Sequence, residues 1–178
     1  MTSPVMFSQK KTEWETPEDL FVHLDNLFDI ALDACATPEN AKCEPYYTEE
    51  QNGLKQSWSV RDHQSVFCNP PYGRGLDKWL RKGQEELAAG HCPRVVFLLP
   101  ARTDTRWFHD YIWDSFSHHP RTGVELQFID GRLQFEHATS SAPFPSMVVV
   151  MRSQTGMHRY RERSGKSAMR PKVGREVT

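Results

Sequence analysis

Four short runs of continuous apolar residues predict the buried strands of this protein. A strand covered on both faces is apolar at every position, whereas a half-exposed strand alternates between apolar and polar residues. The runs lie at residues 30–32, 66–68, 95–99 and 147–151, and the first predicted strand, residues 30–33, ends at an acid, Asp33. The sequence therefore predicts a sheet whose central strands are covered on both sides.

Apolar residues at helical spacing lie between these runs. Thr16 as an N-cap, followed by Pro17 and two acidic residues, predicts the start of a helix that continues to residue 28. Residues 76–90 carry a second apolar stripe, and residues 105–116 carry a third that ends at Phe116. We expect three helices.

Residues 124–135 alternate and contain Asp130-Gly131, a dipeptide typical of hairpin turns. The order of elements predicts an α/β fold: a largely parallel sheet with helices on both faces and an antiparallel strand pair near the C-terminal end. Ligands of such sheets bind beyond the carboxyl ends of the strands. Asp33 and Asn69 lie at those ends.

The length of 178 residues and the mass of 20.6 kDa fit one domain and a tail. We place the domain at residues 1–152 and a basic, flexible tail at residues 153–178. Residues 1–151 hold 14 lysines and arginines against 21 acids, whereas residues 152–178 hold 8 against 2. A basic tail on an acidic body favours a nucleic-acid partner, because lysine and arginine release counterions from phosphates. The alternative is a tail that only interacts with solvent.

The pattern excludes several classes of protein. The longest apolar runs are five residues, too short to cross a bilayer, and no signal peptide opens the sequence. We therefore expect a soluble protein of the cytoplasm. The four cysteines form no C-x-x-C pair and the eight histidines no H-E-x-x-H pattern, so we expect neither a metal site nor a disulfide framework.

Asn69-Pro70-Pro71-Tyr72 is the motif with the clearest chemistry. Two prolines cannot continue a central strand, so the turn is stiff and its carbonyls are free. An asparagine oxygen and a backbone carbonyl can accept both N–H bonds of an exocyclic amine, which aims the nitrogen lone pair at an electrophile. An aromatic residue at the fourth position can stack on a base taken out of the duplex. The motif favours methylation of an amine, although a plain turn or a disordered ligand motif has the same four residues.

Further motifs follow in a characteristic order along the chain. They are Trp14-Glu15-Thr16-Pro17, Leu32-Asp33-Ala34-Cys35-Ala36, Asn52-Gly53-Leu54 with Trp58, Leu98-Leu99-Pro100-Ala101, Gly131-Arg132-Leu133 with Phe135, and Phe144-Pro145-Ser146. Together with the Asn-Pro-Pro-Tyr motif they resemble the phage-type DNA N6-adenine methyltransferases, the Dam-like family, over about residues 7–151. The resemblance implies a Rossmann-like methyltransferase sheet, S-adenosylmethionine (SAM) as cofactor, double-stranded DNA as partner and a bacterial host cell.

The resemblance also implies roles for individual residues. Asn69, Pro70, Pro71 and Tyr72 match the catalytic motif of amino-methyltransferases. The residues implied to bind the cofactor are Trp14, Thr16 and Pro17 beside its methionine part, Asp33 and Ala34 beside its amino acid or ribose, and Glu50 beside a ribose hydroxyl.

One segment departs from the usual methyltransferase pattern. The loop after the first strand, residues 33–40, contains no glycine, whereas many methyltransferases use glycines there to let the backbone approach the cofactor. DNA contact must come from the tail or from a local patch on the acidic body, for which Arg102, Arg106 and Arg121 are the candidates.

The sequence leaves three alternatives to a DNA adenine methyltransferase. The acceptor could be adenine in RNA, the N4 of cytosine or the amide of a protein glutamine. The chain could instead be a non-catalytic DNA-binding protein with a decayed methyltransferase fold, or an interaction module that acts through its tail. The oligomeric state and the recognition sequence stay open.

Overall fold

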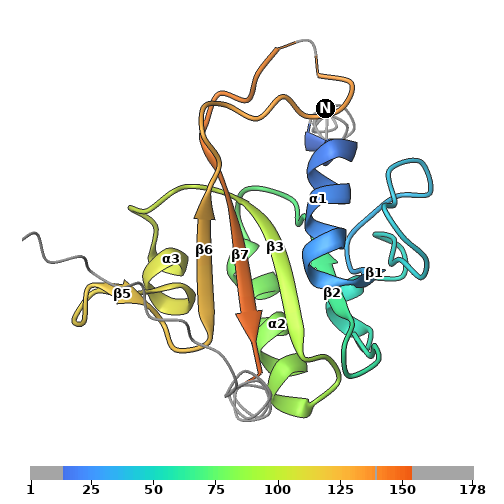
Figure 1. Ribbon diagram of the computed structural model, residues 1–178, viewed down its shortest axis with the longest axis horizontal. Helices are drawn as coiled ribbons and strands as arrows, with labels where there is room; N and C mark the ends of the chain where they lie inside the picture. The colour runs from blue at the N-terminus through green and yellow to red at the C-terminus, as the bar shows by residue number, and fades with distance from the viewer. Residues whose placement is uncertain (1–13, 139, 154–178) are drawn as a thin grey trace, which may run out of the picture.

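Five strands form a mixed sheet at the centre of the computed structural model, which describes residues 14–138 and 140–153. The strands are, in spatial order, β1 (Ile30–Asp33), β2 (Ser65–Cys68), β3 (Arg94–Pro100), β7 (Ser146–Arg152) and β6 (Val124–Phe128). β1, β2 and β3 are parallel, whereas β7 is antiparallel to both of its neighbours. Figure 1 shows β6 and β7 as neighbouring arrows that point in opposite directions.

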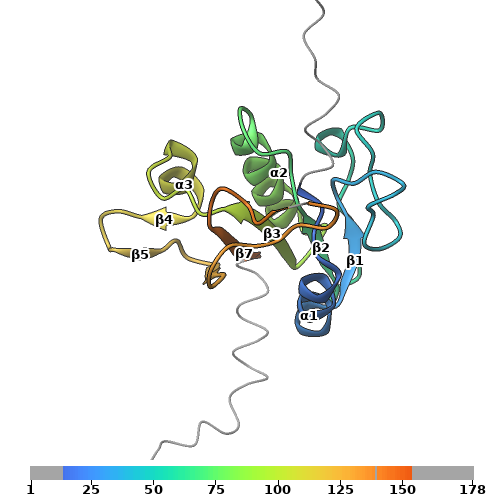
Figure 2. The ribbon, with the colours of Figure 1, turned by 90° about the horizontal axis from the view of Figure 1, so that it is seen from above.

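Helices cover both faces of this sheet (Figure 2). α1 (Glu18–Phe28) lies on one face, and α2 (Leu76–Ala89) and α3 (Arg106–Tyr111) lie on the other. The strand residues alternate accordingly. Phe67 packs in the cluster of α1, whereas its neighbours Val66 and Cys68 pack in the cluster of α2 and α3. The predicted α/β sheet with helices on both faces and an antiparallel strand pair is confirmed.

The third helix is shorter than predicted. α3 ends at Tyr111, and the chain then forms the two-stranded hairpin of β4 (Trp113–Asp114) and β5 (His119–Pro120). The Asp114 carboxylate accepts the backbone N–H groups of Phe116 and Ser117, a local turn that competes with the helix. Phe116 is 96% exposed, so the prediction that it belongs to an apolar helix face is wrong.

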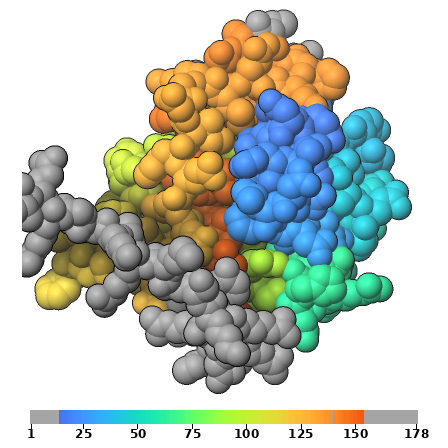
Figure 3. Space-filling view, viewed as in Figure 1, coloured from blue at the N-terminus to red at the C-terminus, as the bar shows by residue number. Residues whose placement is uncertain are grey.

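The hairpin predicted at Asp130-Gly131 is also wrong. β6 ends at Phe128, and its partner is β7, which follows only after residues 129–145. In the space-filling view this long connection, coloured orange, packs against α1, coloured blue (Figure 3). The apolar run of β7 is a better partner for β6 than the mixed segment directly after the turn, because it buries a full strand in the sheet.

The connection from β1 to β2 contains one short 3-10 helix, η2 (Gly53–Lys55). Gly53 is pressed against the loop after β1: a Cβ atom at this position would lie 2.2 Å from the Ala34 carbonyl oxygen. The close backbone approach at the end of β1 therefore involves a glycine from a distant segment rather than one within the loop.

Gly53→Ala is therefore expected to lower the free energy of unfolding by about 2–3 kcal/mol, because the Ala34 backbone must shift to admit a methyl group. Denaturant unfolding measures the change. Lys55→Ala, an exposed change in the same 3-10 helix, is the matched control and should have little effect. Equal stability of the two variants would contradict this close packing.

Within the described ranges, no helix has the length and apolar character needed to cross a membrane. The predicted basic tail lies, apart from Ser153, outside the described residues.

Candidate active site

The carboxyl ends of the three parallel strands meet at one edge of the sheet. The register pairs Asp33 with Phe67 and Cys68 with Phe97, so the ends of β1 and β2 are nearly level. Asn69 follows β2 directly, and the segment that precedes α1 lies against it. The predicted motifs from three parts of the chain are therefore brought together here.

The Asn69 amide is fixed by that segment. Its Nδ2 atom donates to the Trp14 carbonyl oxygen at 2.8 Å and to the Thr16 hydroxyl at 3.0 Å. A carbonyl oxygen can only accept, so the amide nitrogen has to face Trp14. The Oδ1 atom of Asn69 is consequently left as an acceptor, as are the carbonyls of Pro70 and Pro71, to which no described residue donates.

Thr16 does not cap the first helix, so that prediction is wrong. α1 begins at Glu18, and Pro17 occupies the N-cap position. The side chain of Pro17 forms no hydrogen bond with the helix. The first free N–H, that of Glu18, instead donates to the carboxylate of Glu136 at 3.0 Å. A proline cannot offer a capping oxygen, so the cap comes from the distant β6–β7 connection.

Tyr72 is held in an aromatic cluster. Its ring stacks on Trp14 with centroids 6.4 Å apart, and it meets Phe135 at 6.3 Å and Phe144 at 5.5 Å edge to face. Its hydroxyl donates to the Leu98 carbonyl at 3.4 Å. Burial, followed by the nearby Cys68, raises the pKa of Tyr72 far above its ordinary value. The ring is therefore a neutral, fixed wall rather than a base.

A cleft of about 1020 Å³ opens beside this cluster. It brings together the turn after β2, the loop after β3 and the β6–β7 connection. The residues that line it include four aromatic residues, two arginines and two serines: Trp14, Tyr72, Trp107, Phe144, Arg74, Arg102, Ser140 and Ser141. Among the residues predicted from the sequence, the cleft is lined by Trp14, Tyr72 and Arg102.

Asp33 is almost completely buried at the end of β1, with 2% of its surface exposed. One carboxylate oxygen accepts the Cys35 backbone N–H at 3.3 Å and the other accepts that of Lys42 at 3.2 Å. Burial raises the pKa of Asp33 to about 6, against the lowering effect of these bonds and of the Lys42 charge. Asp33 thus shapes the following loop, in which Ala34 is fully buried and donates to the Phe67 carbonyl.

The pKa of Asp33 predicts a pH-dependent contribution to stability. In the folded protein the pKa of Asp33 is about 6, whereas its ordinary value, which applies to the unfolded chain, is 3.8. Between pH 3.8 and pH 6 the native state therefore binds more protons at this residue than the unfolded state does. Stability from this group is therefore highest at low pH and falls as the pH rises through that window, by up to about 3 kcal/mol. The free energy of unfolding of wild type minus that of Asp33→Asn should decrease from pH 4 to pH 7. A difference that is constant over this range would contradict the buried, protonatable carboxylate.

Three other predicted site residues lie away from Asn69. Glu50 is exposed on the turn before η2. Arg106 is exposed on α3 and forms an ion pair with Asp110 at 3.4 Å. Arg121 directs its guanidinium to the His109 carbonyl at 2.8 and 3.1 Å, which ties the end of β5 to α3. The structure does not bring these three residues into the cleft.

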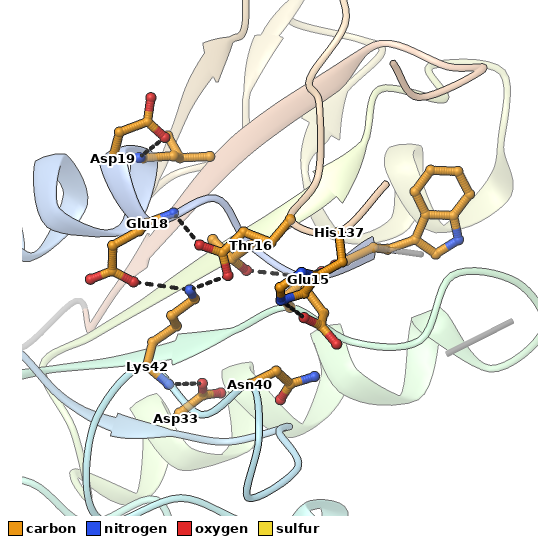
Figure 4. A network of polar contacts seen from close by, with 12 residues as sticks. Glu15, Thr16, Glu18, Asp19, Asp33, Asn40, Lys42 and His137 are labelled. Atoms are coloured by element: carbon orange, nitrogen blue, oxygen red, sulfur yellow. Dashed lines mark hydrogen bonds and ion pairs between the residues drawn. The ribbon is translucent and has the colours of Figure 1, made fainter. Parts of the chain in front are cut away.

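An ionic network around the Lys42 side chain could not be predicted from local sequence. The Lys42 ammonium, whose side chain is 7% exposed, contacts Glu136 at 2.8 Å and Glu18 at 3.0 Å (Figure 4). Burial lowers the pKa of Lys42, but the bonds to Glu136 and Glu18 outweigh this and raise it. The network links the loop after β1, the start of α1 and the β6–β7 connection.

One group of potential metal ligands belongs to the same region. Ligand atoms of Glu15, Glu136 and His137 lie within 4.8 Å of one another. The Lys42 ammonium already neutralises the Glu136 carboxylate, and the His137 ring lies 3.6 Å from the Glu15 carboxylate. Each member of the group therefore has a partner among the described residues.

Comparisons with known proteins identify the family of the chain. The family model described as DNA N-6-adenine-methyltransferase (Dam) matches residues 5–172. The DNA N-6-adenine-methyltransferase of Escherichia phage T1 is 38% identical over 96 residues, which are 53% of this chain and 38% of that protein. The putative methyltransferase YfdM of Escherichia coli (strain K12) is 41% identical over 64 residues, 34% of this chain and 70% of that protein.

Among solved structures, the 23S rRNA methyltransferase ErmE aligns with a TM-score of 0.48 and 11% identity, over 84% of this chain and 76% of that one. The present chain spans well under half of the phage T1 protein. The family model, in contrast, covers nearly the whole chain, including the Trp14 segment, Asp33 and the Asn-Pro-Pro-Tyr turn. The chain belongs to the DNA N-6-adenine-methyltransferase (Dam) family.

Proposed function

We propose that this protein is a SAM-dependent methyltransferase that acts on the N6 amino group of adenine in double-stranded DNA. The observation that carries the proposal is the Asn69 amide. The Trp14 carbonyl fixes its nitrogen, so its oxygen remains an acceptor, and the same turn carries Tyr72, which lines the cleft together with Trp14. Family membership supports the same reaction.

The side chains around the ends of β1 and β2 fit the chemistry of SAM. The cofactor carries a positively charged amino group and sulfonium, and two buried carboxylates, Asp33 and Glu15, are available in this region. The Thr16 hydroxyl lies beside Asn69 and offers a polar contact to the methionine part. When bound, SAM supplies a methyl group on a positively charged sulfur. Within this proposal, Glu50 binds a ribose hydroxyl of the cofactor, which requires that the exposed turn carrying Glu50 moves towards the cofactor.

Asn69 and Pro70 then prepare the acceptor nitrogen. The Asn69 oxygen and the Pro70 carbonyl accept the two N–H bonds of adenine N6, which favours a pyramidal nitrogen whose lone pair is free to attack. Positive charge that develops on the nitrogen is stabilised by both oxygens. Tyr72, fixed by its aromatic neighbours, stacks on the extrahelical base. The proton leaves the nitrogen after transfer, so no strong base is required.

The proposed setting follows from the substrate. A protein that methylates phage or prophage DNA works in the cytoplasm of the bacterial host, and the basic segment 153–178 adds charge attraction for the duplex. The domain, in this proposal, is residues 1–152.

The identity of the acceptor is tested with a panel of substrates. Labelled SAM is incubated with duplex DNA, single-stranded DNA, RNA and a glutamine-containing peptide, and the methylated product is identified by chromatography. The proposal predicts label in N6-methyladenine from DNA. Label in cytosine, in RNA or in the peptide would replace adenine in DNA by that acceptor, and SAM binding without transfer to any of them would remove the proposed function.

A further inference from the structure

We infer that Arg74 and Arg102 bind the phosphates that flank the target adenine, so that the cleft between them receives a nucleotide rather than a base alone. This inference rests on the proposed function and gives it a specific binding site for the DNA strand. Arg74 was not a candidate in the sequence, because nothing in the sequence placed it beside Arg102.

Both arginines lack a partner within the described part of the chain, where neither has an ion pair or a side-chain hydrogen bond. Three surface arginines are occupied, Arg106 by Asp110, Arg121 by the His109 carbonyl and Arg152 by Glu125, whereas Arg61 and Arg132 are exposed like Arg74 and Arg102 but do not line the cleft. Arg74 and Arg102 differ from these two because they line one cleft, on a body in which acids outnumber basic residues by 21 to 14. They supply local positive charge where the proposed substrate enters.

The backbone at Arg102 is held in place although its side chain is exposed. Its N–H donates to the Pro100 carbonyl at 2.8 Å, and its own carbonyl accepts the Thr105 hydroxyl at 2.8 Å. The tight turn therefore fixes where the side chain leaves the backbone, at the mouth of the cleft. A guanidinium carried by such an ordered backbone binds a phosphate with little loss of backbone entropy.

Arg74 is presented in a comparable way from the turn after β2. It lies between Gly73 at φ 134° and Gly75 at φ 96°, backbone conformations that other residues rarely adopt. The turn leads directly into α2, whose N-terminal end carries partial positive charge and adds to the attraction for an anion. The two arginines thus come from loops that follow neighbouring strands and line the same cleft.

The remaining walls of the cleft suit the base. Trp14, Tyr72, Trp107 and Phe144 offer aromatic surface, and aromatic surface with flanking arginines is the usual composition of a single-strand nucleotide site. A guanidinium pairs with phosphate oxygens in a bidentate manner and carries no sequence information. Arg74 and Arg102 are therefore expected to set affinity and position without setting the recognition sequence.

The test compares Arg74→Ala, Arg102→Ala and the double variant with Arg106→Ala, an equally exposed arginine of α3 that is already paired with Asp110. Binding of the full chain to duplex DNA is measured over a series of salt concentrations, together with SAM binding, melting temperature and steady-state methylation. Each single cleft variant should bind DNA about 5- to 10-fold more weakly than wild type. The slope of log affinity against log salt should be smaller in magnitude by about 1 in each single variant and by about 2 in the double variant. KM for DNA should rise while kcat at saturating DNA and SAM affinity stay near wild type.

The outcomes separate this inference from the proposed function. Methylation of DNA by wild type, with cleft variants that behave like Arg106→Ala, would overturn the phosphate site and leave the proposed function intact. Wild type that neither binds nor methylates duplex DNA would overturn both. An unchanged salt slope with a lowered kcat would also reject the phosphate site, because it would place the arginines in the chemical step instead.

Discussion

Asn69→Ala is expected to lower the rate of methyl transfer by about 100- to 1000-fold. The substitution removes the oxygen that stabilises charge on the acceptor nitrogen, and a single preorganised hydrogen-bonding group of this kind accounts for about 3–4 kcal/mol of transition-state stabilisation. SAM affinity and the melting temperature should change little, because Asn69 is only half-buried at the strand end and its two side-chain hydrogen bonds join it to the segment before α1. Single-turnover kinetics at saturating SAM and DNA measure the effect on the chemical step.

Asn69→Asp is the informative companion. It keeps the size of the side chain but replaces the amide nitrogen by an oxygen, which would face the Trp14 carbonyl without a proton to share. Turnover should fall in this variant as well, although an acceptor oxygen is still present, because the orienting bond is lost. Near wild-type turnover in Asn69→Ala would contradict the assignment of Asn69, and near wild-type turnover in Asn69→Asp would contradict the role of the Trp14 carbonyl.

Trp58→Ala is expected to lower the free energy of unfolding by about 4 kcal/mol. The indole is fully buried, its Nε1 atom donates to the Gly53 carbonyl at 2.9 Å, and its backbone N–H donates to the buried Glu86 carboxylate at 2.8 Å. Truncation leaves a large cavity between α2 and the long connection from β1 to β2. Chemical denaturation monitored by circular dichroism measures the loss.

Trp79→Ala is the matched control for this prediction. Trp79 stacks on Trp58 with centroids 6.3 Å apart, but it is only half-buried. Its truncation should therefore cost clearly less than that of Trp58. A loss of stability at Trp58 no greater than at Trp79 would contradict the view that Trp58 anchors the connection that carries Gly53.

The central strands could be predicted because their signal is local and strong. Residues 95–99 and 147–151 are apolar at every position, and in the structure they are paired in the middle of the sheet and buried on both faces. The Asn-Pro-Pro-Tyr turn was equally clear, since two prolines have to end a central strand. These features predicted the fold class, which the structure confirms, and a candidate site at the end of β2.

The extent of the third helix and the hairpin at Asp130-Gly131 were predicted wrongly because tertiary contacts override the local pattern at both places. The apolar spacing continues past Tyr111, but the Asp114 carboxylate binds the next backbone N–H groups and Trp113 stacks on Phe108. Asp130-Gly131 has the composition of a hairpin turn, yet β6 finds a better partner in β7. Propensity is a weak prior, and tertiary pairing overrides it in both cases.

Other features of the site depend on contacts that have no sequence signature. Lys42 and Glu136 are 94 residues apart and share a part-buried ion pair, and neither lies in a recognisable motif. Thr16 has the composition of a helix cap, but its hydroxyl accepts the Asn69 amide. Only the folded chain shows which acceptor each donor finds, so the orientation of the Asn69 amide could not be derived from the sequence.

The central claim is that the Asn69 turn directs methyl transfer to adenine N6 in DNA. The most direct measurement incubates unmethylated duplex DNA with labelled SAM and either wild type or Asn69→Ala, and then separates the nucleosides. The account predicts labelled N6-methyladenine with wild type and at most a trace with Asn69→Ala. Label in any other nucleoside, or equal amounts of N6-methyladenine from both proteins, would contradict it.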